Sequence, residues 1–210
     1  MKNYNTLNEI LKDEIVNYIK KISKGLGKVD TKFIADVTTG ILSNNSVLLS
    51  DIVRQTGNLN IKKGVERLER HLDSFDEIKN KLLINYINMV KAYINKRHLY
   101  FVDRGDIVKD NNTKFENKGL VLDGSDLHTV KQGYQINEIA TIDNNNQPIS
   151  LVSELRSSND EDYKSDNDLW LQHMNYVNNI FGKGTFIMDR AYDSAILMEK
   201  NTRNWVRFHN

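Results

Sequence analysis

The sequence predicts an α/β chain in which a helical region precedes a mixed β-sheet with flanking helices. Apolar residues recur at helical spacing through the first half, and β-prone runs separated by turn residues follow from Leu99 onward. The charge changes at the same place. Residues 1–98 hold 17 Lys and Arg against 11 Asp and Glu, whereas residues 99–210 hold 12 against 17. We therefore expect a helical region over 1–98 and a second domain over 99–210.

The composition excludes several classes of protein. The 210 residues contain no Cys, which removes disulfides, thiolate metal sites and cysteine nucleophiles. No apolar run reaches the roughly 18 residues of a membrane helix, and the charged, amphipathic N-terminus is unlike a secretory signal. We therefore expect a cytoplasmic protein with no membrane partner. The charge asymmetry indicates either a polyanion-binding module beside a carboxylate-rich site or a chance fluctuation in a highly charged chain.

Five helices are predicted in the first half. The first carries an apolar stripe and is stopped by Gly25 and Gly27; the stripe comprises Leu7, Ile10, Leu11, Ile15, Tyr18, Ile19 and Ile22. A second helix is expected at about 31–42. Ser50 is interpreted as the N-cap of a short third helix that Gly57 closes. The fourth and fifth are expected at about 61–72 and 75–95.

The fourth helix carries the clearest nucleic-acid signal. At about 100° per residue, its apolar side chains form one stripe, and Lys63, Arg67 and Arg70 fall on the opposite side. This pattern is typical of a helix-turn-helix motif that contacts the phosphate backbone of DNA. It consists of a short helix, a turn and a second helix with an exposed basic stripe. The alternative is an ordinary amphipathic helix whose basic face is diluted by Glu66 and Glu69.

In the second half, two short apolar runs each end at an aspartate. Leu99–Val102 precedes Asp103, and Gly184–Met188 precedes Asp189. Between and after these runs the pattern predicts three strands of an antiparallel meander, two helices and a last strand; their ranges are 119–122, 133–142, 149–155, 166–181, 194–200 and 205–208. Two carboxylates at neighbouring strand ends would repel each other unless a divalent cation such as Mg²⁺ neutralised them. The alternative is that both aspartates only open turns.

Several motifs in order resemble those of DDE transposases of bacterial insertion sequences, and most closely the IS-four-like group with a ribonuclease-H-like catalytic domain. The first-aspartate motif is YFVDRGDIVK, in which Gly105 stands where the group has Thr. FIMDRAYD is similar to the second-aspartate motif. The matching residues between and beside them are Asp106, Ile107, Lys109, Asp123–Ser125, Lys131–Tyr134, Ser153–Leu155, Lys164–Asn167, Arg190, Tyr192 and Asp193.

The resemblance implies DNA transposition, with metal-dependent cleavage and strand transfer of transposon ends. Asp103 and Asp189 would be the catalytic and metal-binding carboxylates, with Mg²⁺ or Mn²⁺ as cofactor. The helical region would bind double-stranded transposon-end DNA in a nucleoid-associated bacterial protein, with a homodimer as a further partner. Lys131 is interpreted as a DNA contact or a strand-packing residue, and Arg190 as a phosphate contact or an ion-pair partner of Asp193.

The third acidic residue of the group, a Glu, is expected beyond Asn210, so we expect the chain as given to be inactive or impaired. Two alternatives follow. The chain could be a truncated, non-catalytic DNA-binding product that occupies ends or inhibits a full-length partner, or an unrelated metal-dependent nuclease. The five histidines show no ligand spacing and are interpreted as incidental.

Overall fold

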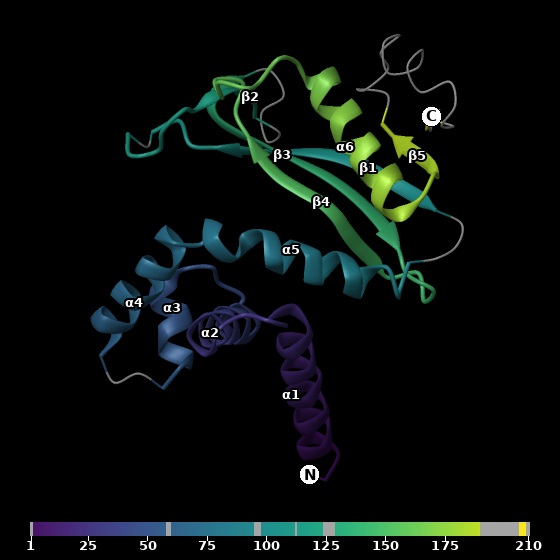
Figure 1. Ribbon diagram of the computed structural model, residues 1–210. Coiled ribbons are helices and arrows are strands. Elements are labelled where there is room, and N and C mark those ends of the chain that lie inside the picture. Colours follow the sequence, from purple (N-terminus) through teal and green to yellow (C-terminus); the bar gives the residue numbers. More distant parts are fainter. Residues whose placement is uncertain are drawn as a thin grey trace. The chain divides into compact units, whose positions relative to one another are not determined.

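In the computed structural model the chain forms two compact units, residues 1–92 and 93–210 (Figure 1). The structure describes residues 2–57, 60–94, 98–111, 113–123, 129–189 and 206–208. Arg190, Tyr192, Asp193 and the helix expected at 194–200 lie outside the described residues, as do Gly124, Ser125 and the expected boundary residues 96 and 97. Within the described residues, no helix combines the length and hydropathy needed to cross a bilayer.

The first unit is helical, as the periodicity predicts. Its helices are α1 (Lys2–Ile22), α2 (Lys28–Asn44), α3 (Leu49–Gln55), α4 (Ile61–Asp73) and α5 (Asp76–Val90). Helices α2, α3 and α4 enclose a small core made of Phe33, Ile52, Val53 and Leu68. Gly64 permits this packing, because a Cβ at its position would overlap the Val53 side chain. The close approach of α4 to α3 therefore depends on a residue without a side chain.

The prediction that Ser50 caps α3 is wrong. The helix begins at Leu49, its N-cap is Leu48, and no side chain caps it. Ser46 organises the turn instead: its hydroxyl accepts a hydrogen bond from the Leu48 N–H at 3.2 Å and donates one to Asp51 at 2.8 Å. Ser46 thus orders the turn before α3 without capping the helix.

Helix α5 ends earlier than the predicted limit near residue 95. It stops at Val90, and Ile94 forms an isolated antiparallel bridge with Asp143 in the second unit. The apolar pattern continues past Val90, but Lys91 and Ala92 form a turn whose N–H groups donate to the Ile87 and Met89 carbonyls, and Ile94 already bridges to Asp143.

In the described part of the second unit, six strands form one mixed sheet. Its strands are β1 (Leu99–Val108), β2 (Gly119–Leu122), β3 (Val130–Ile142), β4 (Pro148–Arg156), β5 (Thr185–Met188) and β6 (Val206–Phe208). Their order is β2-β3-β1-β5-β6, and β4 also pairs with β3. β2, β3 and β4 form the predicted antiparallel meander, whereas β5 runs parallel to β1 and β6 parallel to β5.

Helix α6 (Asp166–Phe181) lies along one face of this sheet (Figure 1). Its range matches the prediction, and Ser165 caps it by accepting a hydrogen bond from the Asp168 N–H. Side chains from α6 and from alternate positions of β1 and β5 are fully or almost fully buried; they include Trp170, Met174, Val177, Tyr100, Val102, Phe186 and Met188. The core of the second unit therefore lies between α6 and one face of the sheet.

The prediction that the first strand ends at Asp103 is wrong. β1 continues to Val108, and its residues from Phe101 to Val108 pair without interruption with β3. The sequence turns polar at Asp103 because the side chains from there on either face away from α6 or meet charged partners. Backbone pairing with β3 sustains the strand without an apolar run.

Candidate functional site

Asp103 and Asp189 occupy corresponding positions on neighbouring strands. In the parallel register, Val102 of β1 pairs with Met188 of β5, and each aspartate is the next residue of its chain segment. Both aspartates are exposed, whereas Val102 and Met188 are buried. Since side chains alternate between the two faces of a sheet, Asp103 of β1 projects from the face opposite α6, and Asp189 directly follows the end of β5. The neighbouring central strands that the sequence predicts are therefore observed.

The peptide after Asp103 holds this carboxylate in place. Asp103 Oδ1 accepts a hydrogen bond from the backbone N–H of Arg104 at 2.8 Å. The Arg104 side chain points to the other face, where its guanidinium pairs with Asp166 of α6 at 2.6 Å. The Tyr163 hydroxyl donates to the same carboxylate at 2.7 Å, and burial and this hydrogen bond raise the pKa of Tyr163 to about 12. β1 is thus tied to α6 immediately after the candidate catalytic residue.

Asp106 does not join Asp103, although the resemblance places both in one motif. They are three positions apart along a strand, so their side chains lie on opposite faces of the sheet. Burial raises the pKa of Asp106, the charges of Asp123 and Asp166 raise it further, and nearby Arg104 lowers it. Asp106 therefore belongs to the charged cluster on the α6 side.

Glu138 is an acidic neighbour that the sequence reasoning missed. It lies directly opposite Asp103 in the antiparallel β1–β3 register and shares its face. Asn137 and Ile139 on either side of it are buried, so strand alternation turns Glu138 to the other face; no local sequence pattern specifies the register that sets it opposite Asp103. Like charges directly opposite each other destabilise a strand pair.

Replacing Glu138 with Gln should therefore raise the free energy of unfolding by about 0.2–1 kcal/mol at low ionic strength. Chemical denaturation measures the change, and it should shrink in 1 M salt, where charges are screened within about 3 Å. Glu161→Gln, at an exposed position outside the sheet, is the matched control and should leave stability unchanged. A stabilisation that is equal at both salt concentrations would contradict the repulsion.

The chemistry of Asp103 and Asp189 fits a hydrated divalent cation in part. Carboxylate oxygens are the ligands of Mg²⁺, which binds through one or two of them and keeps several waters. Among the described residues, no group of three or more His, Asp or Glu side chains converges as a metal site would require. The two aspartates could thus supply at most two carboxylate ligands, and metal binding by them stays a prediction.

Lys131, predicted as either a DNA contact or a strand-packing residue, forms an ion pair with the almost fully buried Asp123 at 2.5 Å. The hydroxyl of Tyr134, which lies on the same strand as Lys131, donates to the backbone carbonyl of Glu116. Both side chains therefore have contacts that hold the β2–β3 region together, and the role of Lys131 in DNA contact stays a prediction.

The predicted basic stripe of α4 is divided. Lys63 and Arg70 are exposed, but the Arg67 guanidinium pairs with Asp36 of α2 at 2.6 Å and is about one quarter exposed. The prediction of an exposed Arg67 is therefore wrong. The buried face of α4 centres on Gly64 and Leu68, whereas the apolar stripe in the sequence also includes Ile61 and Leu72. This orientation brings Arg67 to the edge of α2 and leaves Ile61 and Leu72 exposed.

Among the histidines interpreted as incidental, His173 and His71 have contacts that join a helix to a neighbouring element. The His173 ring of α6 lies 2.6 Å from Glu154 of β4 and is almost fully buried. Glu154 also pairs with Arg156 at 3.1 Å. His71 of α4 stacks on Phe33 with ring centroids 4.9 Å apart. These contacts are structural, since each joins a helix to its neighbour inside one unit.

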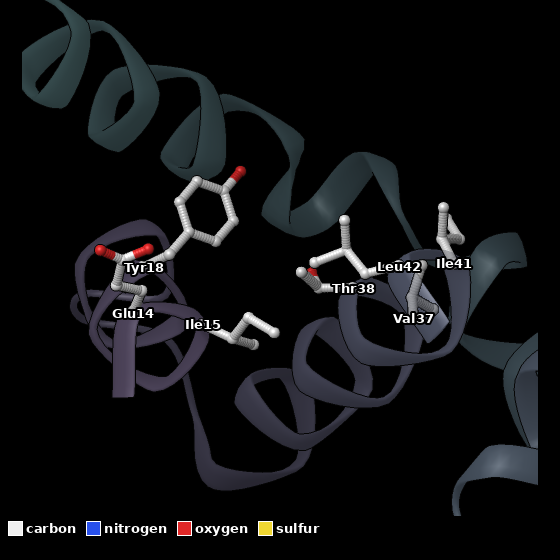
Figure 2. Close-up of a pocket in the computed structure, with 7 residues that line it drawn as sticks. All are labelled: Glu14, Ile15, Tyr18, Val37, Thr38, Ile41 and Leu42. Atoms are coloured by element: carbon white, nitrogen blue, oxygen red, sulfur yellow. The ribbon is translucent and has the colours of Figure 1, made fainter. Parts of the chain in front are cut away.

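A mostly apolar pocket of about 500 Å³ lies between α1 and α2 (Figure 2). Ile15 and Tyr18 of α1 face Val37, Ile41 and Leu42 of α2 across it, with Glu14 and Thr38 at its margins. Its only charged lining residue is an acid, so it is poorly suited to phosphate. It therefore is not part of the candidate site for DNA chemistry.

No family model matches this chain, and no curated protein matches its sequence.

Proposed function

We propose that this chain carries the catalytic carboxylates of a DDE-type transposase, which cleaves DNA at element ends and transfers the strands with Mg²⁺ or Mn²⁺. The observation that supports the proposal is the parallel register of β1 and β5, in which Val102 pairs with Met188, the residues directly before Asp103 and Asp189. Two aspartates 86 residues apart in sequence are thereby adjacent in space. This is the arrangement that the resemblance implies for the catalytic pair.

The order of the sheet also supports a ribonuclease-H-like domain. An antiparallel meander is followed by α6 and then by strands parallel to β1; Asp103 lies in β1, and Asp189 directly follows the neighbouring strand β5. A divalent cation supplies charge neutralisation and an activated water for phosphodiester hydrolysis. Asp103 and Asp189 would hold it, and the Arg104 N–H fixes the orientation of one of these carboxylates.

The helical unit is the proposed DNA-binding module. α3, the turn with Gly57 and α4 pack around a common core, and Lys63 and Arg70 are exposed on α4. A helix held in this way can approach the phosphate backbone with its solvent side. With Arg67 paired to Asp36, Lys63 and Arg70 remain as the phosphate contacts on this helix.

Lys63→Ala combined with Arg70→Ala should therefore lower the affinity for duplex DNA and flatten its dependence on salt. Each lost phosphate contact removes about 0.9 from the slope of log K against log salt. Fluorescence anisotropy with a mixed-sequence duplex at several salt concentrations measures the slope. Arg67→Ala should instead lower the melting temperature, because it leaves Asp36 without its guanidinium partner. An unchanged slope in the double variant would contradict DNA contact by α4 and would favour the alternative, an ordinary amphipathic helix.

The proposed activity is tested by incubating the chain with labelled DNA in Mg²⁺ or Mn²⁺. We expect weak metal-dependent nicking and no 3′-end joining, since two carboxylates hold hydrated ions less rigidly than three and in-line attack tolerates little misplacement. DNA binding without any metal-dependent nicking would favour a non-catalytic DNA-binding role. Nicking that needs no metal would contradict the proposal.

A further inference from the structure

A pocket of about 480 Å³ lies where the end of α1 and the following loop meet α5. It is separate from the exposed face of α4 and from the apolar pocket between α1 and α2. Its lining lies wholly within the described residues and comprises Lys21, Lys24, Gly25, Lys81, Asn85, Asn88 and Met89. Three of these seven residues carry an ammonium group and none carries a carboxylate.

Hydrogen bonds between α5 and the loop build the wall of this pocket. Lys81 donates to the carbonyl of Gly25 at 2.6 Å. The side-chain amide of Asn85 donates to the carbonyls of Ile22 and Lys24 at 2.8 and 2.9 Å. Gly25 has a positive φ of 76°, and a Cβ there would lie 2.8 Å from the Lys81 side chain. The loop conformation thus brings the Lys81 ammonium close to the backbone.

Capping of α1 does not account for all of the positive charge. A helix C-terminus carries the equivalent of roughly half a negative charge, whereas the pocket holds three ammonium groups. The contact of Lys81 with Gly25 already places one cation at this helix end. Lys21 and Lys24 add two further charges at the exposed margin, and the side-chain amide of Asn88 adds a neutral hydrogen-bond donor.

We propose that this pocket binds a backbone phosphate of duplex DNA, with Lys21 and Lys24 as the main contacts and Lys81 held ready by Gly25. The proposal rests on the proposed function, in which the helical unit binds DNA. It adds a second phosphate-binding site to that unit, besides Lys63 and Arg70 of α4. A concave group of ammonium and amide donors suits a phosphate, which presents only acceptor oxygens.

The first experiment maps lysine accessibility on the complete chain. The protein is acylated briefly with an amine-reactive reagent, with and without a mixed-sequence duplex, and each lysine is quantified by mass spectrometry. DNA should slow acylation of Lys21 and Lys24 but not of Lys12, which is exposed on α1 and outside the pocket. Equal protection of Lys12 and Lys24 would overturn the proposal. Protection by millimolar inorganic phosphate but not by DNA would overturn it as well.

The second experiment compares the salt dependence of DNA binding between variants. Lys21→Ala with Lys24→Ala should reduce the slope by about one to two, because each lost phosphate contact removes about 0.9. Lys12→Ala should leave the slope unchanged, and Lys21→Arg with Lys24→Arg should preserve it, since the charges remain. Circular dichroism checks that every variant keeps its helices.

The two proposals fail in different ways. A wild-type chain with no salt-dependent affinity for DNA would remove the proposed function and this site together. Salt-dependent binding by the wild type, with the same slope in the Lys21/Lys24 and Lys12 variants, would overturn only the pocket.

Discussion

Replacing Asp103 or Asp189 with Asn should abolish metal-dependent DNA nicking and weaken Mn²⁺ binding. Each change keeps the shape of the side chain but removes one of the two carboxylates on the exposed face of β1 and β5. Metal ions contribute several kcal/mol to transition-state stabilisation, and about 1.36 kcal/mol corresponds to a tenfold change in rate. The expected loss is therefore at least about a hundredfold. Conversion of supercoiled plasmid to the open form measures nicking, and electron paramagnetic resonance measures bound Mn²⁺.

Two controls make this result specific. Glu161→Gln removes an exposed acid from the loop between β4 and α6 and should leave nicking unchanged. Asp106→Asn changes the motif residue that lies on the opposite face of the sheet and should affect Mn²⁺ binding much less than Asp103→Asn. If Asp106→Asn and Asp103→Asn abolish metal binding equally, the metal site is not on the face that we propose.

Gly133→Ala should destabilise the second unit strongly, by about 3 kcal/mol or more, the upper end of the usual cost of overpacking. Gly133 of β3 pairs with Val108 of β1 on one side and with Gly119 of β2 on the other. A Cβ at this position would overlap the backbone carbonyl of Ile107. A backbone atom in a paired strand cannot rotate away as a side chain can. Thermal and urea unfolding followed by circular dichroism measure the loss.

Gly105→Ala is the matched control on the neighbouring strand. A Cβ at Gly105 would lie 3.2 Å from a methyl group of Ile136, which can shift by a small side-chain rotation. Its effect should stay within about 1 kcal/mol, because the strain is offset by the lower entropy of the unfolded chain. Equal destabilisation by both substitutions would show that loss of glycine itself, and not the contact with Ile107, is responsible.

The sequence predicted the local elements of this protein well. Apolar spacing located the five helices of the first unit, and the range of α6 agrees with the structure. The polar Ser165 before an apolar periodic segment is a local signal, so the start of α6 could be read without tertiary information. The short apolar run 184–188 likewise identified β5 and placed Asp189 directly after it. These features depend on neighbours within a few positions of the chain.

The candidate carboxylate pair depends partly on the local sequence and partly on the tertiary structure. Its members could be named from the sequence, because each follows a short apolar run. Their adjacency depends on a parallel register between residues more than 80 positions apart. Glu138 entered the same face only through the antiparallel register with β3, which no local pattern specifies. The catalytic role of Asp103 and Asp189 stays a prediction that the Asn variants test.

What only the tertiary structure decided was the environment of individual side chains. Helical geometry predicted an exposed Arg67. In the structure Gly64 lets α4 pack closely on Val53, and Arg67 of α4 pairs with Asp36 of α2. Asp103 counted as the end of a strand, but pairing with β3 carries β1 on to Val108. His173 of α6 contacts Glu154 of β4 across the interface between α6 and the sheet. Periodicity shows which face of a helix or strand is apolar. Contacts with neighbouring helices and strands decide the exact orientation of that face and the residue at which the helix or strand ends. The sequence by itself therefore determined the elements and the two aspartates, and long-range packing and strand register determined which charged side chains meet.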